Sequence, residues 1–210
     1  MKESIPLYNS RIAKVYIDFV QQNYPDIDVE VILKQAGINV WELEDPSHWF
    51  TQDQQDRLHD ALVSYTGNEN IARDAGRYAG SSDALGAIRQ YIIGLMNPAA
   101  IYMLLGKIYP MLSRAAEVQP RKTGSNSMEI ITVPKANFEE RPYQCANRMG
   151  LFEAIAGLYS DKFADIDHPS CIHKGDDCCR YIINWNKSPK NIWLRVRNFI
   201  LSLNAIMLYN

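Results

Sequence analysis

Several features that would assign a function class are missing from the sequence. It has no Gly-rich phosphate loop, no phosphate-binding lysine motif and no Gly-x-Ser-x-Gly elbow, so nucleotide chemistry is not indicated. Its 22 basic and 24 acidic residues give a net charge of −2, and no nucleic-acid motif is recognisable. A nucleic-acid partner is therefore disfavoured. No segment reaches the ~18 to 20 consecutive apolar residues that a membrane span needs.

The N-terminal residues also lack a secretory signal. The segment Met1 to Pro6 has neither an apolar core nor a small-residue cleavage site, so we expect a domain in the reducing cytoplasm. A chain of 210 residues can bury a core without disulfide bonds. Its four cysteines are therefore expected to be metal ligands or free thiols rather than disulfide partners.

The first half of the sequence has helical periodicity. Apolar residues recur at helical spacing, and capping signals such as Thr51, Gly37 and Asn97-Pro98 mark helix ends. The spacing predicts helices over 12–20, 29–36, 52–65, 68–78 and 99–109.

The second half alternates between strand and helix patterns. A hairpin is predicted over 118–122 and 128–133, and a helix over 147–159. A second strand pair follows at 162–168 and 179–185. This order predicts an α+β fold, in which a helical N-terminal half precedes an antiparallel sheet (strand-strand-helix-strand-strand) that helices cover on one face.

We divide the chain into an N-terminal helical region (1–80), an α+β ligand-binding domain (81–186) and a C-terminal output or linker helix (187–210). In the last region basic residues precede an apolar run, Phe199 to Tyr209, that reaches the final residue without a capping signal. This run is either an amphipathic helix packed on the domain or a linker to a membrane segment, dimer coil or effector domain. The chain can thus be the front piece of a longer protein.

Three of the four cysteines lie in one short stretch. Cys171 and Cys179 flank a Gly-Asp-Asp turn, and Cys145 precedes the helix expected beside this hairpin. Zinc prefers four thiolate, imidazole or carboxylate ligands, often two from one tight loop and others from a neighbouring element. The spacing is consistent with such a site, and equally with four unmetallated thiols, because free cysteine is a common buried residue.

The fourth ligand of this site stays open. Neighbouring side chains of a strand point to opposite faces, so Cys178 is not expected to share a metal with Cys179 unless it belongs to the turn. Among the histidines, His168 and His173 are better metal candidates than His48 and His59, because they lie near the cysteines in the sequence. The candidates are Glu129, Glu139, His173 and Cys178.

At these residues the chain resembles the 4-vinyl reductase family of sensor domains. The matching pattern is Cys171, the Gly175-Asp176 turn, Cys179 and the strand Tyr181 to Trp185, together with the helix after Cys145. The resemblance covers approximately residues 80 to 186. The N-terminal helices resemble the front of sensor modules attached to bacterial histidine kinases or cyclases.

The resemblance implies a zinc-bearing sensory domain that binds a small, largely apolar molecule. Its metal positions carry over to Cys145, Cys171 and Cys179. The family shares its fold with subunits of the TRAPP trafficking complex and with haem nitric-oxide sensors, and it is similar to the sensing halves of phenol- and toluene-responsive activators. Phenol itself is a poor candidate, because between Gln90 and Ser170 this chain has no tryptophan and only His168 as a histidine.

Ligand-binding and cofactor residues are less clearly marked. Pockets are mostly apolar with a few polar groups, and six side chains between helices and sheet match that description, although such residues are more often core. His48 and His59 could ligate haem, but no supporting motif accompanies them, so haem is expected to be unlikely. The six candidate ligand residues are Tyr91, Met96, Tyr102, Leu105, Tyr109 and Phe152.

These observations predict a non-enzymatic, cytoplasmic sensor domain that signals to an attached or partner signalling domain through its last helix. We expect a homodimer formed by the helical half, and leave open a position at the inner face of the membrane. The alternative is a trafficking-type assembly module with a permanently filled pocket. Catalysis by Cys145 with His168, or by paired carboxylates, has no supporting local signature.

Overall fold

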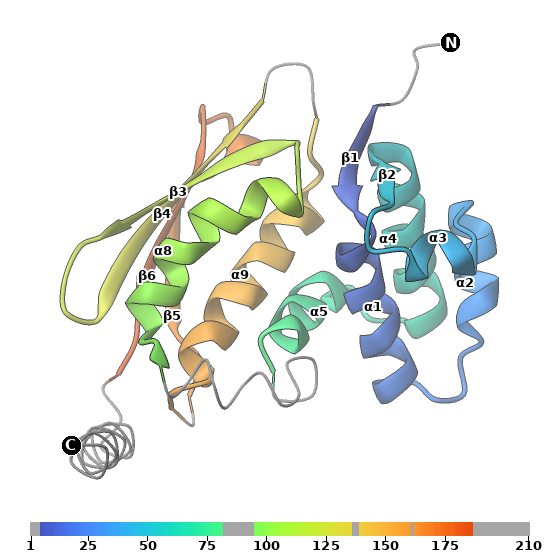
Figure 1. Ribbon diagram of the computed structural model, residues 1–210, viewed down its shortest axis with the longest axis horizontal. Coiled ribbons are helices and arrows are strands. Elements are labelled where there is room, and N and C mark those ends of the chain that lie inside the picture. Colours follow the sequence, from blue (N-terminus) through green and yellow to red (C-terminus); the bar gives the residue numbers. More distant parts are fainter. Residues whose placement is uncertain (1–4, 82–94, 136–138, 161, 187–210) are drawn as a thin grey trace, which may run out of the picture.

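The computed structural model describes residues 5–81, 95–135, 139–160 and 162–186, and it has the α+β fold that the sequence predicts. The N-terminal helices gather at one end of the molecule, and a four-stranded antiparallel sheet with two helices on one face forms the other end (Figure 1). The N-terminal end contains β1 (Pro6–Asn9), α1 (Ser10–Asn23), α2 (Val29–Ala36), α3 (Val40–Glu44), β2 (Trp49–Thr51), α4 (Gln52–Thr66) and α5 (Ile71–Ala79).

The predicted N-terminal helices are confirmed, because their caps are local. The Thr51 side chain accepts a hydrogen bond from the Gln54 amide, and Gly37 ends α2 in the left-handed region at φ 68°. Helix α5 starts at Ile71 rather than at Asn68. The Asn68 side chain accepts from the amide of Asn70 and so forms a turn ahead of the helix.

Three short elements were not predicted. Strands β1 and β2 pair antiparallel, and α3 lies between α2 and β2. The strands have four and three residues, too few for alternation to show in the sequence. They nevertheless position Asn9, the N-cap of α1, and Tyr8, whose hydroxyl donates to Gln52 and accepts a hydrogen bond from Gln144.

The sheet has the order β3-β4-β6-β5, so the two predicted strand pairs join through β4 and β6. Met128 and Ile130 of β4 lie opposite Ile183 and Tyr181 of β6, and these side chains form a core with α8 and α9. The elements are α8 (Pro98–Ile108), β3 (Ala116–Lys122), β4 (Ser127–Pro134), α9 (Pro142–Gly157), β5 (Asp165–Ser170) and β6 (Cys179–Asn184), with 3₁₀ turns at Tyr109–Met111 and Ile172–Lys174.

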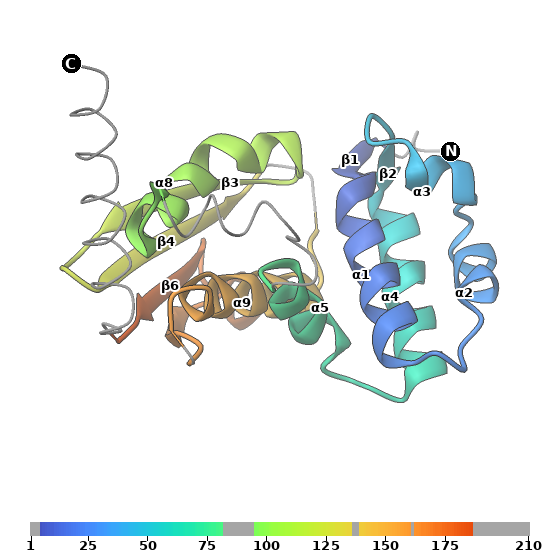
Figure 2. The same ribbon diagram turned by 60° about the horizontal axis from the view of Figure 1, so that its bottom comes forward.

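Helix α9 starts at Pro142, earlier than the predicted Asn147. Proline at a first helical position loses no hydrogen bond, and the polar residues that follow it resemble a loop in the sequence. Tyr143 and Gln144 are nevertheless buried, because the helix meets the N-terminal helices on one side and the sheet on another. Figure 2 shows α9 side by side with α5 of the N-terminal end.

Two glycines let the backbones of α5 and α9 meet. A Cβ atom on Gly150 would lie 1.9 Å from the carbonyl oxygen of Arg73, and one on Gly76 would lie 2.1 Å from that of Asn147. No real Cβ contact is that short, so both positions exclude every side chain. The contact fixes α9 relative to the N-terminal end of the molecule.

An ion pair seals the same contact. The buried Glu153 carboxylate of α9 accepts hydrogen bonds from Arg73 and, at 2.6 Å, from Arg77 of α5. Burial by itself would raise the pKa of Glu153, but the two guanidinium groups more than offset this and hold that pKa below its usual value.

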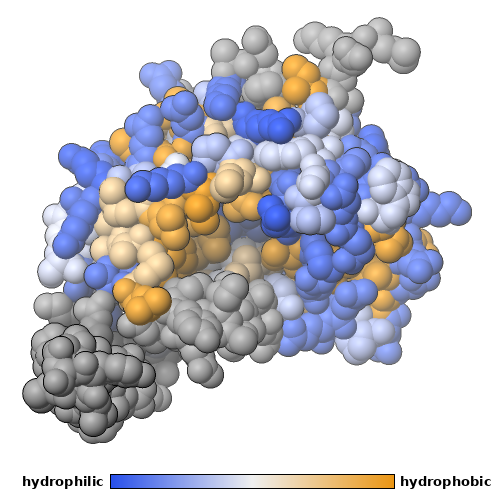
Figure 3. Space-filling view, viewed as in Figure 1, coloured by the Kyte–Doolittle hydropathy of each residue, from blue (hydrophilic) through white to orange (hydrophobic). Residues whose placement is uncertain are grey.

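The surface over α8 is apolar. Met103, Leu104 and Met111 are exposed there, and Figure 3 shows hydrophobic side chains gathered over this part of the molecule. Among the residues that the structure describes, no helix is long and apolar enough to cross a membrane. The predicted C-terminal helix, 187–210, lies outside the described residues.

We predict that Gly150→Ala lowers the free energy of unfolding by about 2 kcal/mol or more, because the helices must separate to admit the methyl group. The matched control is Gly157→Ala in the same helix, where the new Cβ would meet only the Phe163 ring at 3.3 Å. We expect a change within about 1 kcal/mol there. Denaturant unfolding measures both, and equal effects would contradict the close contact.

We also predict that Glu153→Gln lowers the free energy of unfolding at neutral pH by about 1 to 3 kcal/mol; both arginines are partly exposed and can turn to water, which limits the loss. A carboxyl whose folded pKa is depressed stabilises the fold above its unfolded pKa, and this stabilisation is lost as the pH falls through the folded pKa. The difference between wild type and variant should therefore shrink below about pH 4.5.

Denaturant titrations between neutral pH and about pH 3 test this prediction. The exposed Glu69→Gln is the control and should follow the wild type at every pH. A Glu153→Gln difference that stays constant with pH would contradict the assignment.

Candidate metal centre and ligand pocket

The structure brings together the three cysteines that the sequence singled out. Cys145 comes from the first turns of α9, Cys171 from the residue after β5, and Cys179 from the start of β6. The Sγ atoms of Cys145 and Cys179 are 3.5 Å apart, and those of Cys179 and Cys171 are 4.0 Å apart. All three sulfurs lie within 4.8 Å of one another and are buried.

These distances suit a tetrahedral metal. Zinc–sulfur bonds of about 2.3 Å place neighbouring sulfurs of a tetrahedron roughly 3.8 Å apart. Cys178 is half-buried and does not belong to the cluster, as predicted, although it lies in the turn ahead of β6 and not in the strand, so alternation is not the reason. The cluster can therefore offer three thiolates to one ion.

Polar atoms without partners surround the cluster. Among the described residues five side-chain nitrogen or oxygen atoms are buried with no hydrogen-bond partner, and four of them lie here: Thr132 Oγ1, Arg148 Nη1, His168 Nε2 and Tyr181 OH. Thr132 lies opposite Cys179 in the sheet, and the rings of His168 and Tyr181 stack with centroids 4.3 Å apart. A buried group left unpaired is costly, so this concentration indicates a site built to hold charge.

The cluster stabilises one thiolate. The hydrogen bond from the Cys145 thiol, with the neighbouring His168 ring and the Arg148 charge, lowers the pKa of Cys179 to about 4 although burial opposes this. The pKa of Cys145 is correspondingly raised, and burial raises the pKa of Cys171. A thiolate is the form of cysteine that binds metal.

The four candidates for a fourth ligand are all described by the structure, and none of them belongs to the cluster. Glu129 is on the opposite face of β4, where it pairs with Arg121 and Arg180. Glu139 and His173 are exposed. His168, which the sequence also offers as a metal candidate, is not part of that group of three either, but its buried Nε2 lies next to Cys179. The spacing of residues in the sequence does not show that His168, on β5, lies close to Cys179 at the start of β6.

Most of the six predicted ligand residues lie in the hydrophobic core between the four-stranded sheet and helices α8 and α9. Tyr102, Leu105 and Phe152 are buried and pack against the sheet, and the Tyr102 hydroxyl donates to the Phe152 carbonyl at 2.6 Å. Tyr109 accepts a hydrogen bond from Arg148, and Met96 is half-buried. Tyr91 lies outside the described residues. Their role in ligand binding stays a prediction.

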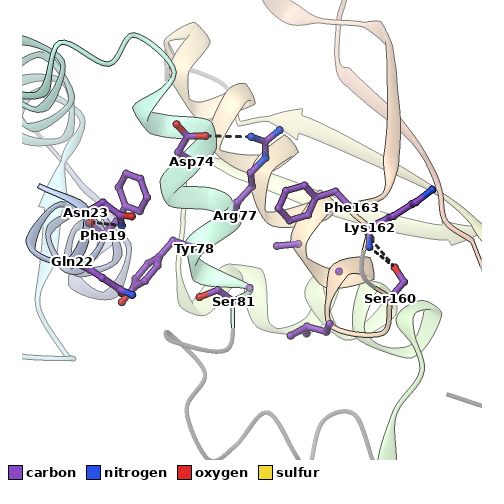
Figure 4. Close-up of a pocket in the computed structure, with 14 residues that line it drawn as sticks. Phe19, Gln22, Asn23, Asp74, Arg77, Tyr78, Ser81, Ser160, Lys162 and Phe163 are labelled. Carbon is purple, nitrogen blue, oxygen red and sulfur yellow. Dashed lines mark hydrogen bonds and ion pairs between the residues drawn. The ribbon is translucent and has the colours of Figure 1, made fainter. Parts of the chain in front are cut away.

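A pocket of about 660 Å³ lies elsewhere, where α1, α5 and the C-terminal end of α9 meet (Figure 4). Phe19 and Tyr78 stand on one side with ring centroids 5.8 Å apart, and Phe163 stands on the other. The volume is in the range of small-molecule sites. No pattern in the sequence indicates this pocket, because its walls come from three separate segments.

The pocket combines apolar and charged walls. The Arg77 guanidinium lies 5.0 Å from the centre of the Phe163 ring, and it also bonds to Asp74 and Glu153. Lys162 adds an exposed ammonium group at the rim. Such walls suit a flat apolar ligand that carries negative groups.

Comparison with solved structures identifies the fold. A mutant H-NOX protein from S. oneidensis in the Fe(II) ligation state superposes with a TM-score of 0.66 at 12% identity, covering 86% of this chain and 98% of that one. An oxygen-binding H-NOX domain related to soluble guanylate cyclases gives 0.63 at 15% identity, covering 85% and 95%. A structure from work on haem distortion in the H-NOX family gives 0.60 at 15%, covering 86% and 96%.

The chain therefore has the H-NOX fold. No family model matches the sequence, and no curated protein matches it. The comparisons support the sensor-domain fold, but neither the 4-vinyl reductase resemblance nor the trafficking-subunit alternative.

The expectation that haem is unlikely was wrong. Solved proteins that share this fold are haem-binding H-NOX domains, so the lack of a supporting motif does not count against haem. The lack of a motif around His48 and His59 does not exclude haem, because haem binding needs one axial ligand and a fitting pocket rather than a local sequence pattern. At 12 to 15% identity, such a relation does not show in the sequence.

Proposed function

We propose that this chain is a small-molecule sensor domain of the H-NOX fold, with haem as the group that occupies the pocket between α1, α5 and α9. The observation that carries the proposal is the position of the pocket. Its walls come from the N-terminal helices and from α9, so an occupant contacts both ends of the molecule. Binding that favours one arrangement of the two ends would shift their populations, which is how a sensor responds.

The pocket fits haem in size and in one ligand type, and Phe19, Leu158 and Phe163 give it an apolar part. Haem iron is held by histidine, cysteine, methionine or tyrosine in known proteins, and Tyr78 is the member of that set among the described lining residues. The four histidines all belong to the described part of the chain, and none of them lines the pocket. Tyr78 would therefore hold the iron, and Arg77 would be the lining cation nearest to the aromatic walls for a carboxylate to face.

Bound haem would supply an iron that takes up a small gas, as the oxygen and nitric-oxide complexes of the neighbours illustrate. The chain's own residues would exclude water with Phe19, Phe163 and Leu158 and would orient the group through Arg77.

We predict that hemin titrated into the purified protein gives a saturable visible absorption band at about one equivalent per chain. Tyr78→Phe should change the band and weaken binding at least about tenfold, because the ring stays but the ligating oxygen is lost. Tyr65→Phe, an exposed tyrosine of α4, is the matched control. No saturable binding, or a band that Tyr78→Phe leaves unchanged, would overturn haem in this pocket.

We further propose that the cysteine cluster holds a structural zinc ion, with His168 as the fourth ligand. Three supporting observations are the sulfur spacing, the low pKa of Cys179 and the unpartnered Nε2 of His168. The ion would join α9 to β6 and to the end of β5. A closed site of four protein ligands stabilises a fold and leaves no position for chemistry.

The purified protein is expected to contain about one zinc per chain, and Cys171→Ser to weaken zinc binding at least about 100-fold. His168→Ala should weaken it as well, and both variants should unfold at lower temperature. Two matched controls are available, Cys178→Ser and His173→Ala, which change the same residue types outside the cluster. Elemental analysis and chelator competition measure the binding.

Zinc that binds wild type and Cys171→Ser equally would show an adventitious ion. Equal effects of His168→Ala and His173→Ala would remove His168 as the fourth ligand. We also propose a homodimer formed by the N-terminal helical half. The attached or partner signalling domain is expected to be reached through the segment 187–210, which lies outside the described residues. Size-exclusion chromatography with light scattering tests the dimer.

A further inference from the structure

Arg77 belongs both to the wall of the pocket and to the ion pair between α5 and α9. Its guanidinium group lies 5.0 Å from the centre of the Phe163 ring, and Figure 4 shows it between Asp74 and that ring. Its Nε donates to the buried Glu153 carboxylate at 2.6 Å, and its Nη1 donates to Asp74 at 3.3 Å. A group that binds Arg77 from the pocket therefore acts on the contact between the two helices.

Arg77 is the member of this ion pair that can turn toward an occupant. Its side chain is 34% exposed, whereas that of Glu153 is 6% exposed. Among the described residues, Arg77 lines the pocket, and Arg73 and Glu153 do not. Arg73 donates to both carboxylate oxygens of Glu153. Glu153 therefore keeps a charged partner when Arg77 turns away, and the cost of an unpaired buried charge is avoided.

The charges of this group cancel. Arg73 and Arg77 supply two positive charges, and Asp74 and Glu153 supply two negative ones. An anion that enters the pocket is attracted by Arg77 and repelled by the Glu153 carboxylate that the same guanidinium holds. The anion and Glu153 therefore compete, even where they use different N–H groups of Arg77.

We propose that Arg77 makes the pocket respond to the charge of its occupant: an anionic group of the occupant and Glu153 compete for Arg77, so an anionic occupant weakens the contact between α5 and α9 and a neutral one does not. The ligand class is a planar, largely apolar molecule with a carboxylate. This inference rests on the sensor function proposed for the pocket and adds how the occupant acts on α9. Arg77 touches the occupant, and Glu153 is a positioning residue that acts through Arg77.

The competition predicts a gain of affinity when Glu153 is changed. Coupling between two sites is reciprocal, so a contact that the occupant weakens must also weaken the binding of that occupant. Glu153→Gln removes the competing charge, keeps a side chain of the same shape and leaves the group with a net charge of +1. It should therefore tighten the binding of an anionic occupant, although it removes an ion pair from the fold. Damage to the fold alone would weaken binding instead.

Hemin and hemin dimethyl ester are matched probes, because they share the ring and the iron and differ in the charge of their carboxyl groups. In absorption titrations of the whole protein, Glu153→Gln should bind hemin about fivefold more tightly than the wild type, and Arg77→Gln at least about fivefold more weakly. The affinity of both variants for the ester should stay within about twofold of the wild type. Glu69→Gln and Arg11→Gln, at exposed positions, are the controls and should change neither affinity.

A double variant tests whether Glu153 acts through Arg77. In the Arg77→Gln background, Glu153→Gln should change the hemin affinity by less than about twofold. Amide hydrogen exchange gives a second readout, because it reports on the helix contact directly. With saturating hemin, the last turn of α5 should exchange at least about threefold faster than with saturating ester, and this difference should vanish in Arg77→Gln.

The outcomes separate this inference from the proposed function. If neither probe binds saturably, haem in the pocket and the competition both fail. If both probes bind but Glu153→Gln binds hemin no more tightly than the wild type, the competition alone is overturned. Equal changes for hemin and its ester also overturn it, and so does a Glu153→Gln effect that persists without Arg77.

Discussion

The contact between the backbones of α5 and α9 is the constraint on which both candidate sites depend. Gly76 and Gly150 allow the helices to approach so closely that no side chain fits between them, and Glu153 closes the contact with Arg73 and Arg77. Because α9 is fixed there, its C-terminal end forms a wall of the pocket. Its N-terminal turns hold Cys145 against β6.

Helix α9 therefore has two different neighbourhoods along its length. Near its start, thiols, a guanidinium group and a carboxylate are buried together, and the unpartnered atoms around them make a charged occupant favourable. Near its end, aromatic and charged side chains line an open space. A metal ion at the cysteine cluster and haem in the pocket would therefore both be bound to α9. Arg148 lies near the cluster, and Glu153 lies near the pocket.

Much of the fold could be predicted because the signals are local. Thr51, Gly37 and the Asn97-Pro98 pair mark helix ends through hydrogen bonds within a few residues, and the alternation in β4 and β6 identifies the sheet. The start of α9 was missed because Tyr143 and Gln144 are polar in sequence but buried in the fold. The expectation about haem failed for a similar reason, because the walls of a pocket come from segments far apart in the sequence and leave no local motif.

The sequence by itself determined the α+β class, most helix and strand positions and the three cysteines as one group, since spacing and capping act over short distances. Only the tertiary structure placed the Sγ atoms of Cys145 and Cys179 3.5 Å apart, brought His168 beside them and buried Arg148 with Glu140. It also showed the pocket and the likeness to haem domains. These depend on segments far apart in the chain, whose meeting is decided by the packing of α9.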